Sequence, residues 1–143
     1  MKLCPLIITS CWLLVGCTSP KSCCPPTGDA PQQVADVAGD YAGTWSNSEG
    51  ATGTLHISLK KSSDSPWQGK VSFTYDGNEA VTSMKSVEVN GTQILMAYEY
   101  KIQDSEGAVE MTGKLAGGNS LQGSYKITGG EGNPGNWEAK RAR

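Results

Sequence analysis

From residue 40 to the end of the chain, apolar and polar residues alternate in short runs that are separated by turn-forming residues. The clearest run is 54–60, where Leu55, Ile57 and Leu59 fall on one face and polar residues fall on the other. A period of two is typical of a β-strand with one buried face, whereas a helix would repeat every 3.6 residues. The pattern therefore predicts an all-β domain.

Eight such runs follow one another, and Gly-, Asn- or Asp-containing turns join most of them. They cover residues 41–45, 54–60, 67–75, 80–89, 94–102, 109–115, 121–127 and 137–141. Asn90-Gly91 is the strongest hairpin signal, because a type I′ turn needs positive φ at both positions. Short connections favour an antiparallel up-and-down meander, and eight tilted strands can close into a barrel without exposed edges. A two-sheet sandwich is the alternative.

Two irregularities refine the predicted barrel. In run 80–89, Val81 shares its parity with Val87 and Val89, but Met84 does not, which indicates a β-bulge between residues 83 and 86. Some inward positions carry glycine, which predicts bends where a side chain would crowd the interior; these are Gly69, Gly113 and Gly123.

Residues 1–16 have the layout of a secretory signal peptide, with Lys2 before apolar runs too short to span a bilayer stably. They end in Leu14-Val15-Gly16-Cys17, which resembles the lipobox of bacterial lipoproteins. The resemblance implies that Cys17 becomes the first mature residue and carries diacylglycerol on its sulfur, usually with a further acyl chain such as palmitate on the amine. Two or more chains anchor a protein stably in a membrane. An ordinary signal peptide, cleaved elsewhere, is the alternative.

Residues 17–39 contain four prolines and are interpreted as a flexible tether, within which residues 34–38 either form a helical turn or cover a barrel end. All five cysteines lie at or before residue 24. Neighbouring Cα atoms are about 3.8 Å apart, closer than the roughly 4.4–6.8 Å of a relaxed disulfide. Cys23 and Cys24 are therefore expected as free thiols, intermolecular bridges or further acylation sites. The resemblance to bacterial lipoproteins also implies the outer membrane if the envelope is Gram-negative, because the residue after the cysteine is Thr18 and not Asp.

Gly43-Thr44-Trp45 in the first run, the eight-run meander and a basic residue after the last run together resemble the lipocalin and wider calycin barrels. The resemblance implies that Gly43 and Trp45 belong to the barrel closure, that Trp45 seals the base, and that Arg141 stacks over its ring, with Arg143 as the alternative. Such a contact contributes roughly 0.5–2 kcal/mol. Lipocalins are longer and usually carry a helix before the final segment. Runs of about seven residues predict a shallow or filled interior.

Composition excludes several kinds of chemistry. Without the leader and its Lys2, 11 basic residues remain against 14 acidic ones, and they form no basic stripe for nucleic acid. His56, the one histidine, falls on an outward face, and adjacent cysteines with one histidine do not make a tetrahedral metal site. Because no inward carboxylate pair, phosphate loop or nucleophile elbow is present, we expect no enzyme activity, no cofactor and no metal.

The aromatic residues have two interpretations: they form a packed core, or they line a ligand pocket. They are Trp45, Trp67, Phe73, Tyr98, Tyr125 and Trp137. The leading hypothesis is a non-enzymatic, lipid-anchored barrel of the bacterial cell envelope that holds a small apolar molecule or lipid in its open mouth. The alternative is a protein-interaction module, either an envelope assembly accessory or a barrel-type protease inhibitor with residues 30–40 as its inserted trunk.

Overall fold

A computed structural model describes residues 36–63 and 67–143. These belong to one compact unit, Pro31–Arg143. The predicted signal peptide, the lipidation site Cys17, the pair Cys23 and Cys24, and residues 17–35 of the predicted tether lie outside the described residues. Across the described ranges, no helix is long and apolar enough to cross a membrane.

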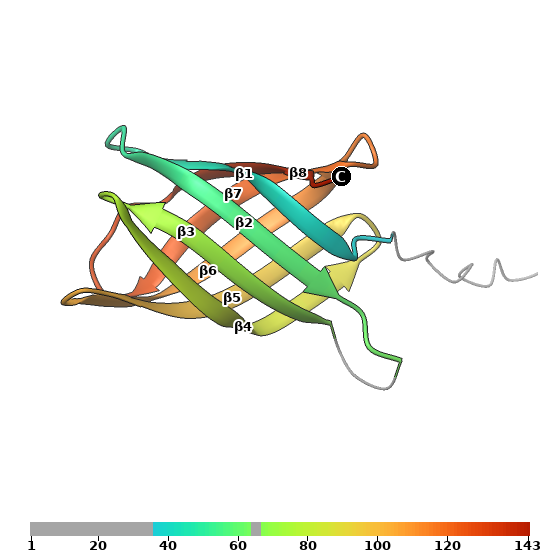
Figure 1. The fold of residues 1–143 in the computed structure, drawn as a ribbon, viewed down its shortest axis with the longest axis horizontal. Helices are drawn as coiled ribbons and strands as arrows, with labels where there is room; N and C mark the ends of the chain where they lie inside the picture. Colours follow the sequence, from blue (N-terminus) through green and yellow to red (C-terminus); the bar gives the residue numbers. More distant parts are fainter. Residues whose placement is uncertain (1–35, 64–66) are drawn as a thin grey trace, which may run out of the picture. The chain divides into compact units, whose positions relative to one another are not determined.

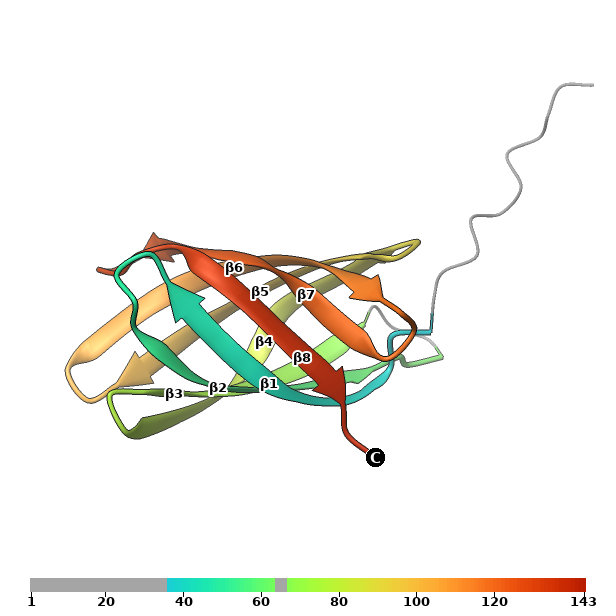
Figure 2. The ribbon, with the colours of Figure 1, turned by 90° about the horizontal axis from the view of Figure 1, so that it is seen from above.

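Eight strands form a closed antiparallel barrel in which each strand pairs with the next and β8 pairs back with β1 (Figures 1 and 2). They are β1 (Gly39–Asn47), β2 (Thr52–Lys60), β3 (Gln68–Tyr75), β4 (Asn78–Asn90), β5 (Gln93–Ile102), β6 (Ser105–Ala116), β7 (Ser120–Gly129) and β8 (Gly135–Arg141). The predicted all-β meander and its closure are confirmed, and the sandwich is excluded. Most strands are longer than the predicted seven residues, so the barrel is deep enough to have two distinct ends.

The predicted bulge in β4 is present, because the register with β5 shifts between Met84 and Ser86 and leaves Lys85 unpaired. One extra residue reverses the parity once, so Met84 before the bulge and Val87 after it both join the hydrophobic core. Val81 has the opposite parity to Met84 and is 70% exposed on the outer face. Ala80 takes the buried position instead.

The two ends of the barrel differ in their connections. We call the mouth the end that carries the β1–β2, β3–β4, β5–β6 and β7–β8 connections, at the left of Figure 1. The base is the opposite end, where the chain enters β1 and leaves β8.

The base is sealed by apolar residues. Val37, just before β1, has 0% exposure and packs in the core together with Tyr41, Leu59 and Leu121. The Tyr41 hydroxyl donates to the Val37 carbonyl oxygen at 3.1 Å, which fixes this segment in place. Of the two alternatives for residues 34–38, the described part covers a barrel end.

Arg141 completes the base, but its aromatic partner differs from the predicted one. Its guanidinium lies over the ring of Tyr41, 5.4 Å from the centroid, and its Nη2 donates to the Tyr41 hydroxyl at 2.9 Å and to the Asp36 carbonyl oxygen at 2.8 Å. Trp45 is four residues further along β1 and pairs with Trp137, nearer the mouth. Tyr41 thus occupies the place that the lipocalin resemblance gave to Trp45. Gly43 does lie at the closing seam, where any Cβ would meet the backbone of β8.

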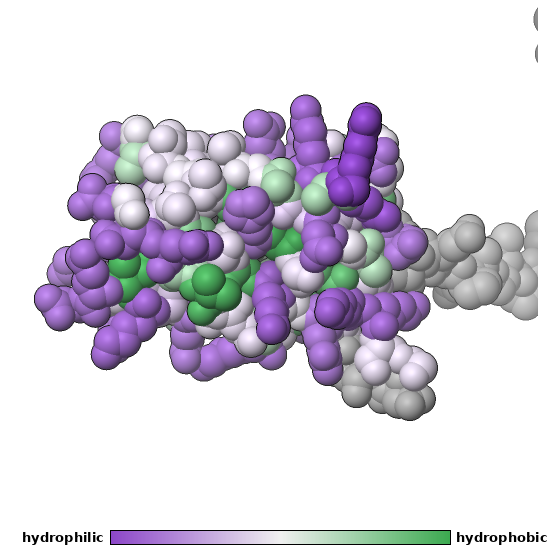
Figure 3. Space-filling view, viewed as in Figure 1, coloured by the Kyte–Doolittle hydropathy of each residue, from purple (hydrophilic) through white to green (hydrophobic). Residues whose placement is uncertain are grey.

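The outer surface is largely hydrophilic, and Figure 3 shows polar residues over most of one face with isolated hydrophobic spots. His56 is exposed on this outer surface, as alternation predicts. Ion pairs join neighbouring strands, Lys85 with Glu99 and Lys126 with Glu110. Both pairs are solvent-exposed and contribute little to stability.

Candidate functional site

The mouth opens into a cavity of about 310 Å³ inside the barrel. Its walls are mainly aromatic and aliphatic, with contributions from Trp45, Leu55, Phe73, Tyr75, Tyr98, Tyr100, Ile102, Val109, Met111, Tyr125, Ile127 and Trp137. Because the base is sealed, the mouth is the natural route from solvent into this space. Ligand pockets of roughly 300–1,000 Å³ with apolar walls are typical binding sites for small molecules.

Two groups of rings shape the walls. Trp45 stacks on Tyr75, with ring centroids 6.0 Å apart and planes at 22°, and meets Tyr125 edge-on at 6.2 Å. Phe73 contacts Tyr98 at 5.9 Å and meets Tyr100 edge-on at 5.6 Å. Since these contacts join residues of different strands, the rings support one another and hold the cavity in a fixed form.

Inward glycines make room for the two indoles of the cavity. At Gly53, which pairs with Trp45, an added Cβ would lie 2.8 Å from indole Cε2, and the indole nitrogen donates to the Thr74 carbonyl oxygen at 3.0 Å. At Gly113, a Cβ would lie 2.9 Å from Cη2 of Trp137. Among the predicted inward glycines, an added Cβ would meet the Met84 side chain at Gly69 and the Trp137 indole at Gly113, whereas at Gly123 it would meet the backbone of β6.

Four tyrosine hydroxyls in the cavity are free to bind a ligand. Within the described residues, Tyr41 is the tyrosine whose hydroxyl has protein hydrogen-bond partners; Tyr75, Tyr98, Tyr100 and Tyr125 have none. Burial and then the neighbouring tyrosines raise the pKa of Tyr98 well above its ordinary value, and burial with Tyr75 raises the pKa of Tyr100 and of Tyr125. All three therefore remain neutral hydrogen-bond donors at physiological pH.

The rim of the cavity is polar and acidic. Its lining includes Glu49, Asp76 and Glu131, each from a different connection of the mouth, and no Lys, Arg or His. Asn47 fixes the first connection, because its Oδ1 accepts from the backbone N–H of Glu49 at 3.0 Å and of Ala51 at 2.8 Å. The mouth thus combines neutral apolar walls with a negatively charged rim.

Most of the aromatic residues predicted from sequence meet in this cavity. Trp45, Phe73, Tyr98, Tyr125 and Trp137 line it. Trp67 does not: it precedes β3 at the base end, and the Lys61 ammonium lies 5.8 Å from its ring centroid. The prediction missed Tyr75 and Tyr100 as lining residues, although alternation already placed both on inward faces.

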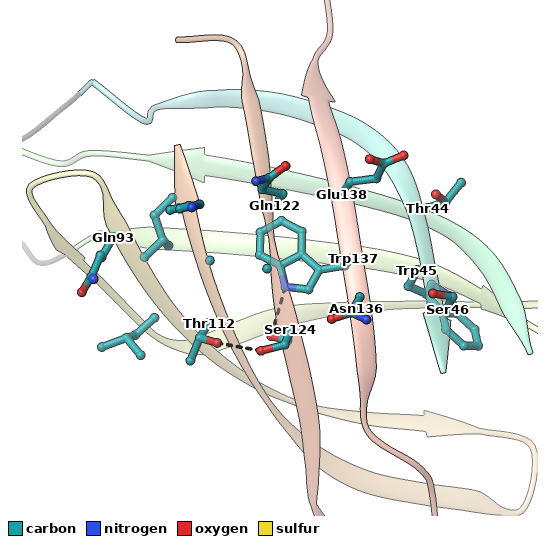
Figure 4. Close-up of a pocket in the computed structure, with 15 residues that line it drawn as sticks. Thr44, Trp45, Ser46, Gln93, Thr112, Gln122, Ser124, Asn136, Trp137 and Glu138 are labelled. Carbon is teal, nitrogen blue, oxygen red and sulfur yellow. Dashed lines mark hydrogen bonds between the residues drawn. The ribbon is translucent and has the colours of Figure 1, made fainter. Parts of the chain in front are cut away.

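A second hollow lies on the outer face, where β5, β6, β7, β8 and β1 run side by side (Figure 4). It is larger, about 780 Å³. Polar and apolar residues both line it, and the Thr112 and Ser124 hydroxyls bond to each other at 3.1 Å. Trp137 packs behind the floor and is only 3% exposed. This wide hollow lies on the outer face and is more open to solvent than the mouth cavity, which is enclosed by the barrel wall, so the mouth cavity is the better candidate.

In sequence, the chain matches no protein family and no curated protein. The closed eight-stranded up-and-down barrel is consistent with a lipocalin-like barrel. Any functional interpretation therefore depends on the geometry of the mouth.

Proposed function

We propose that this protein is a non-enzymatic, membrane-anchored lipoprotein of the bacterial cell envelope whose barrel binds a small apolar molecule or lipid in its mouth. The observation that carries the proposal is the cavity of about 310 Å³, walled by aromatic rings and entered at the end opposite the sealed base. At about 30 Å³ per water, the cavity has room for roughly ten waters, or a ligand of about ten to fifteen heavy atoms. A longer lipid would leave part of its chain outside.

The chemistry of the walls supports binding rather than catalysis. The rings and aliphatic side chains supply apolar surface, and burial of that surface stabilises a complex by roughly 25 cal/mol per Å². His56 is exposed on the outer surface, so it has no access to the cavity or to the rim carboxylates. The tyrosine hydroxyls can orient a bound molecule without reacting with it.

The proposed anchor fits the position of the mouth. Asp36 meets the barrel at the base, where its carbonyl oxygen accepts from Arg141. A lipid at Cys17 would therefore be attached through the end of the barrel that is opposite to the mouth. The mouth would remain accessible while the protein stays at the membrane.

The alternative, a protein-interaction module of the protease-inhibitor kind, gains less support. Its trunk, residues 30–40, would have to enter an enzyme, and the described part of it, residues 36–40, would have to leave the barrel. Val37 is fully buried at the base and Asp36 is bound to Arg141, so releasing this segment would expose core. Only a trunk that ended before residue 36 would be compatible with this packing.

A pair of tryptophan substitutions tests the proposed function. Ser105 is an exposed residue of the rim, and Ser83 is an exposed residue on the outer face of β4. We expect S105W to obstruct the mouth, so that the neutral fluorescent probe 1-naphthol, which is small enough for the cavity, loses at least about tenfold in affinity, whereas S83W binds it as the natural chain does.

Native mass spectrometry of protein extracted with mild detergent gives a second readout of the same proposal. The natural chain and S83W should carry an added mass that S105W lacks. If the natural chain is consistently empty and also fails to bind the probe, the binding function is refuted. The mass of the mature N-terminus tests the anchor separately, since replacement of Cys17 by Ser should remove both lipid and membrane association.

A further inference from the structure

The charge distribution around the mouth is one-sided. Three of its four connections each contribute a carboxylate to the cavity lining: Glu49 in β1–β2, Asp76 in β3–β4 and Glu131 in β7–β8. Lys101 lies near this end, but on an outward position of β5 opposite Glu106. A molecule that enters the cavity therefore passes negative charge and no neighbouring positive charge within the lining.

The backbone holds these carboxylates at the rim. The Ser48 N–H donates to the Pro134 carbonyl oxygen at 3.2 Å, which ties the connection of Glu49 to that of Glu131. Asp76 and Gly77 both have positive φ, 49° and 75°, as in a tight two-residue turn of type I′. A cavity of about 310 Å³ is about as wide as the Debye length of about 8 Å at physiological salt, so salt screens the rim charges only in part for a ligand in the mouth.

The walls below the rim suit a cation as well. Ring faces of tryptophan and tyrosine attract organic cations through their quadrupoles, and this attraction strengthens when water is excluded. Trp45 contacts both Tyr75 and Tyr125, and these three rings line the same cavity as the rim carboxylates.

Tyr98 gives an independent indication of a ligand. It is only 6% exposed, lines the cavity, and its hydroxyl has no hydrogen-bond partner within the described part of the chain. Among the described residues, the fully buried side-chain polar atom without a partner is Arg141 Nε, so the Tyr98 hydroxyl is reached from the open space of the cavity, by water or by a ligand. Its position in the cavity wall marks the interior as a place where a bound molecule makes polar contact.

We propose that the mouth selects organic cations: molecules with an alkyl or aryl body and an ammonium group. The apolar body lies deep in the cavity against Leu55 and Met111, and the ammonium lies at the level of Trp45 and Tyr75 under the rim carboxylates. This inference rests on the proposed binding function and adds the charge of the ligand to it.

Three probes with one alkyl chain and different heads test the inference: octyltrimethylammonium, 1-octanol and octanoate. Isothermal titration calorimetry on the purified full chain should give the cation an affinity at least about tenfold above that of the alcohol, with octanoate weakest. If octanol binds and the cation shows no advantage, the charge inference is refuted while the binding function stands. If none of the probes binds, the binding function fails as well.

A matched pair of triple variants assigns the preference to the rim. The mouth variant is E49Q, D76N and E131Q; the control is D40N, E88Q and E138Q, whose carboxylates are exposed and lie outside the mouth lining. Both remove three negative charges. We expect the mouth variant to lose most of the tenfold preference and to bind octanol as before, and the control to keep the preference. Equal losses in both variants would show that net charge alone attracts the cation, which would overturn the inference.

Discussion

The base and the mouth are built from the same eight strands but are packed in different ways. At the base, Val37, Tyr41, Leu59 and Leu121 are each at most 1% exposed. At the mouth, Tyr75 is 50% exposed and most of the other rings are partly exposed. Aliphatic side chains interdigitate and fill the space between tilted strands, whereas stacked rings support one another and leave a cavity between them.

Polar groups show the same contrast. At the base, the Tyr41 hydroxyl bonds to Val37 and Arg141, and Arg141 also bonds to the Asp36 carbonyl oxygen. In the mouth cavity, four tyrosine hydroxyls have no partner among the described residues. The polar groups of the base are therefore satisfied within the protein, whereas the hydroxyls of the mouth stay available to water or to the proposed ligand.

The largest expected effect on stability comes from truncating one aliphatic side chain at each end of β7. Leu121→Ala at the base should lower the free energy of unfolding by about 2–5 kcal/mol, because it leaves a cavity in a fully packed region. Ile127→Ala in the cavity wall should cost clearly less, because that side chain already borders open space. Urea denaturation of both variants measures the difference. Equal losses would mean that the mouth is packed as tightly as the base.

The next largest effect concerns the closure by Arg141. Arg141→Lys keeps the charge but loses the planar fork that contacts both Asp36 and Tyr41, so the free energy of unfolding should fall by about 1–2 kcal/mol. Amide hydrogen exchange at residues 36–40 should accelerate at the same time. Arg143→Lys, at an exposed position beyond β8, is the control and should change neither quantity. Unchanged exchange in Arg141→Lys would mean that Val37 alone holds the base closed.

Alternation alone predicts most of the barrel. Each strand has one face towards the core, so the inward residues of β2, β3 and β5 follow directly from a period of two. The bulge in β4 was also predictable, since Met84 and Val87 cannot both face inward without one extra residue. Alternation did not predict which apolar residue of β4 would face outward. Val81 does, because its register with Ser72 places it on the outer face.

The candidate site was predicted only in part, because alternation assigns a face and gives no position along the barrel axis. Trp67 and Trp45 both belong to inward-facing runs, but Trp67 lies at the base end and Trp45 at the mouth. The predicted aromatic partner of Arg141 was wrong for the same reason. The register of β1 with β8 places Tyr41, and not Trp45, opposite Arg141. The rim carboxylates lie in connections or at their edge, where no periodicity exists to place them.

The smallest effect at neutral pH, and the one that isolates the mouth, comes from Tyr98→Phe. This substitution removes a hydroxyl without a protein partner, so at pH 7 it should leave the free energy of unfolding within about 1 kcal/mol of the natural value.

At high pH Tyr98→Phe should change the free energy of unfolding more, because the pKa of Tyr98 is raised in the folded state, mainly by burial. Above the ordinary tyrosine pKa of about 10, the unfolded chain loses this proton while the folded chain keeps it, so stability falls by up to about 1.4 kcal/mol per pH unit. Urea denaturation at pH 7 and at alkaline pH should therefore show a smaller alkaline loss for Tyr98→Phe than for the natural chain. Identical losses would mean that the Tyr98 hydroxyl is well hydrated, and that the depth of the mouth is as polar as its rim.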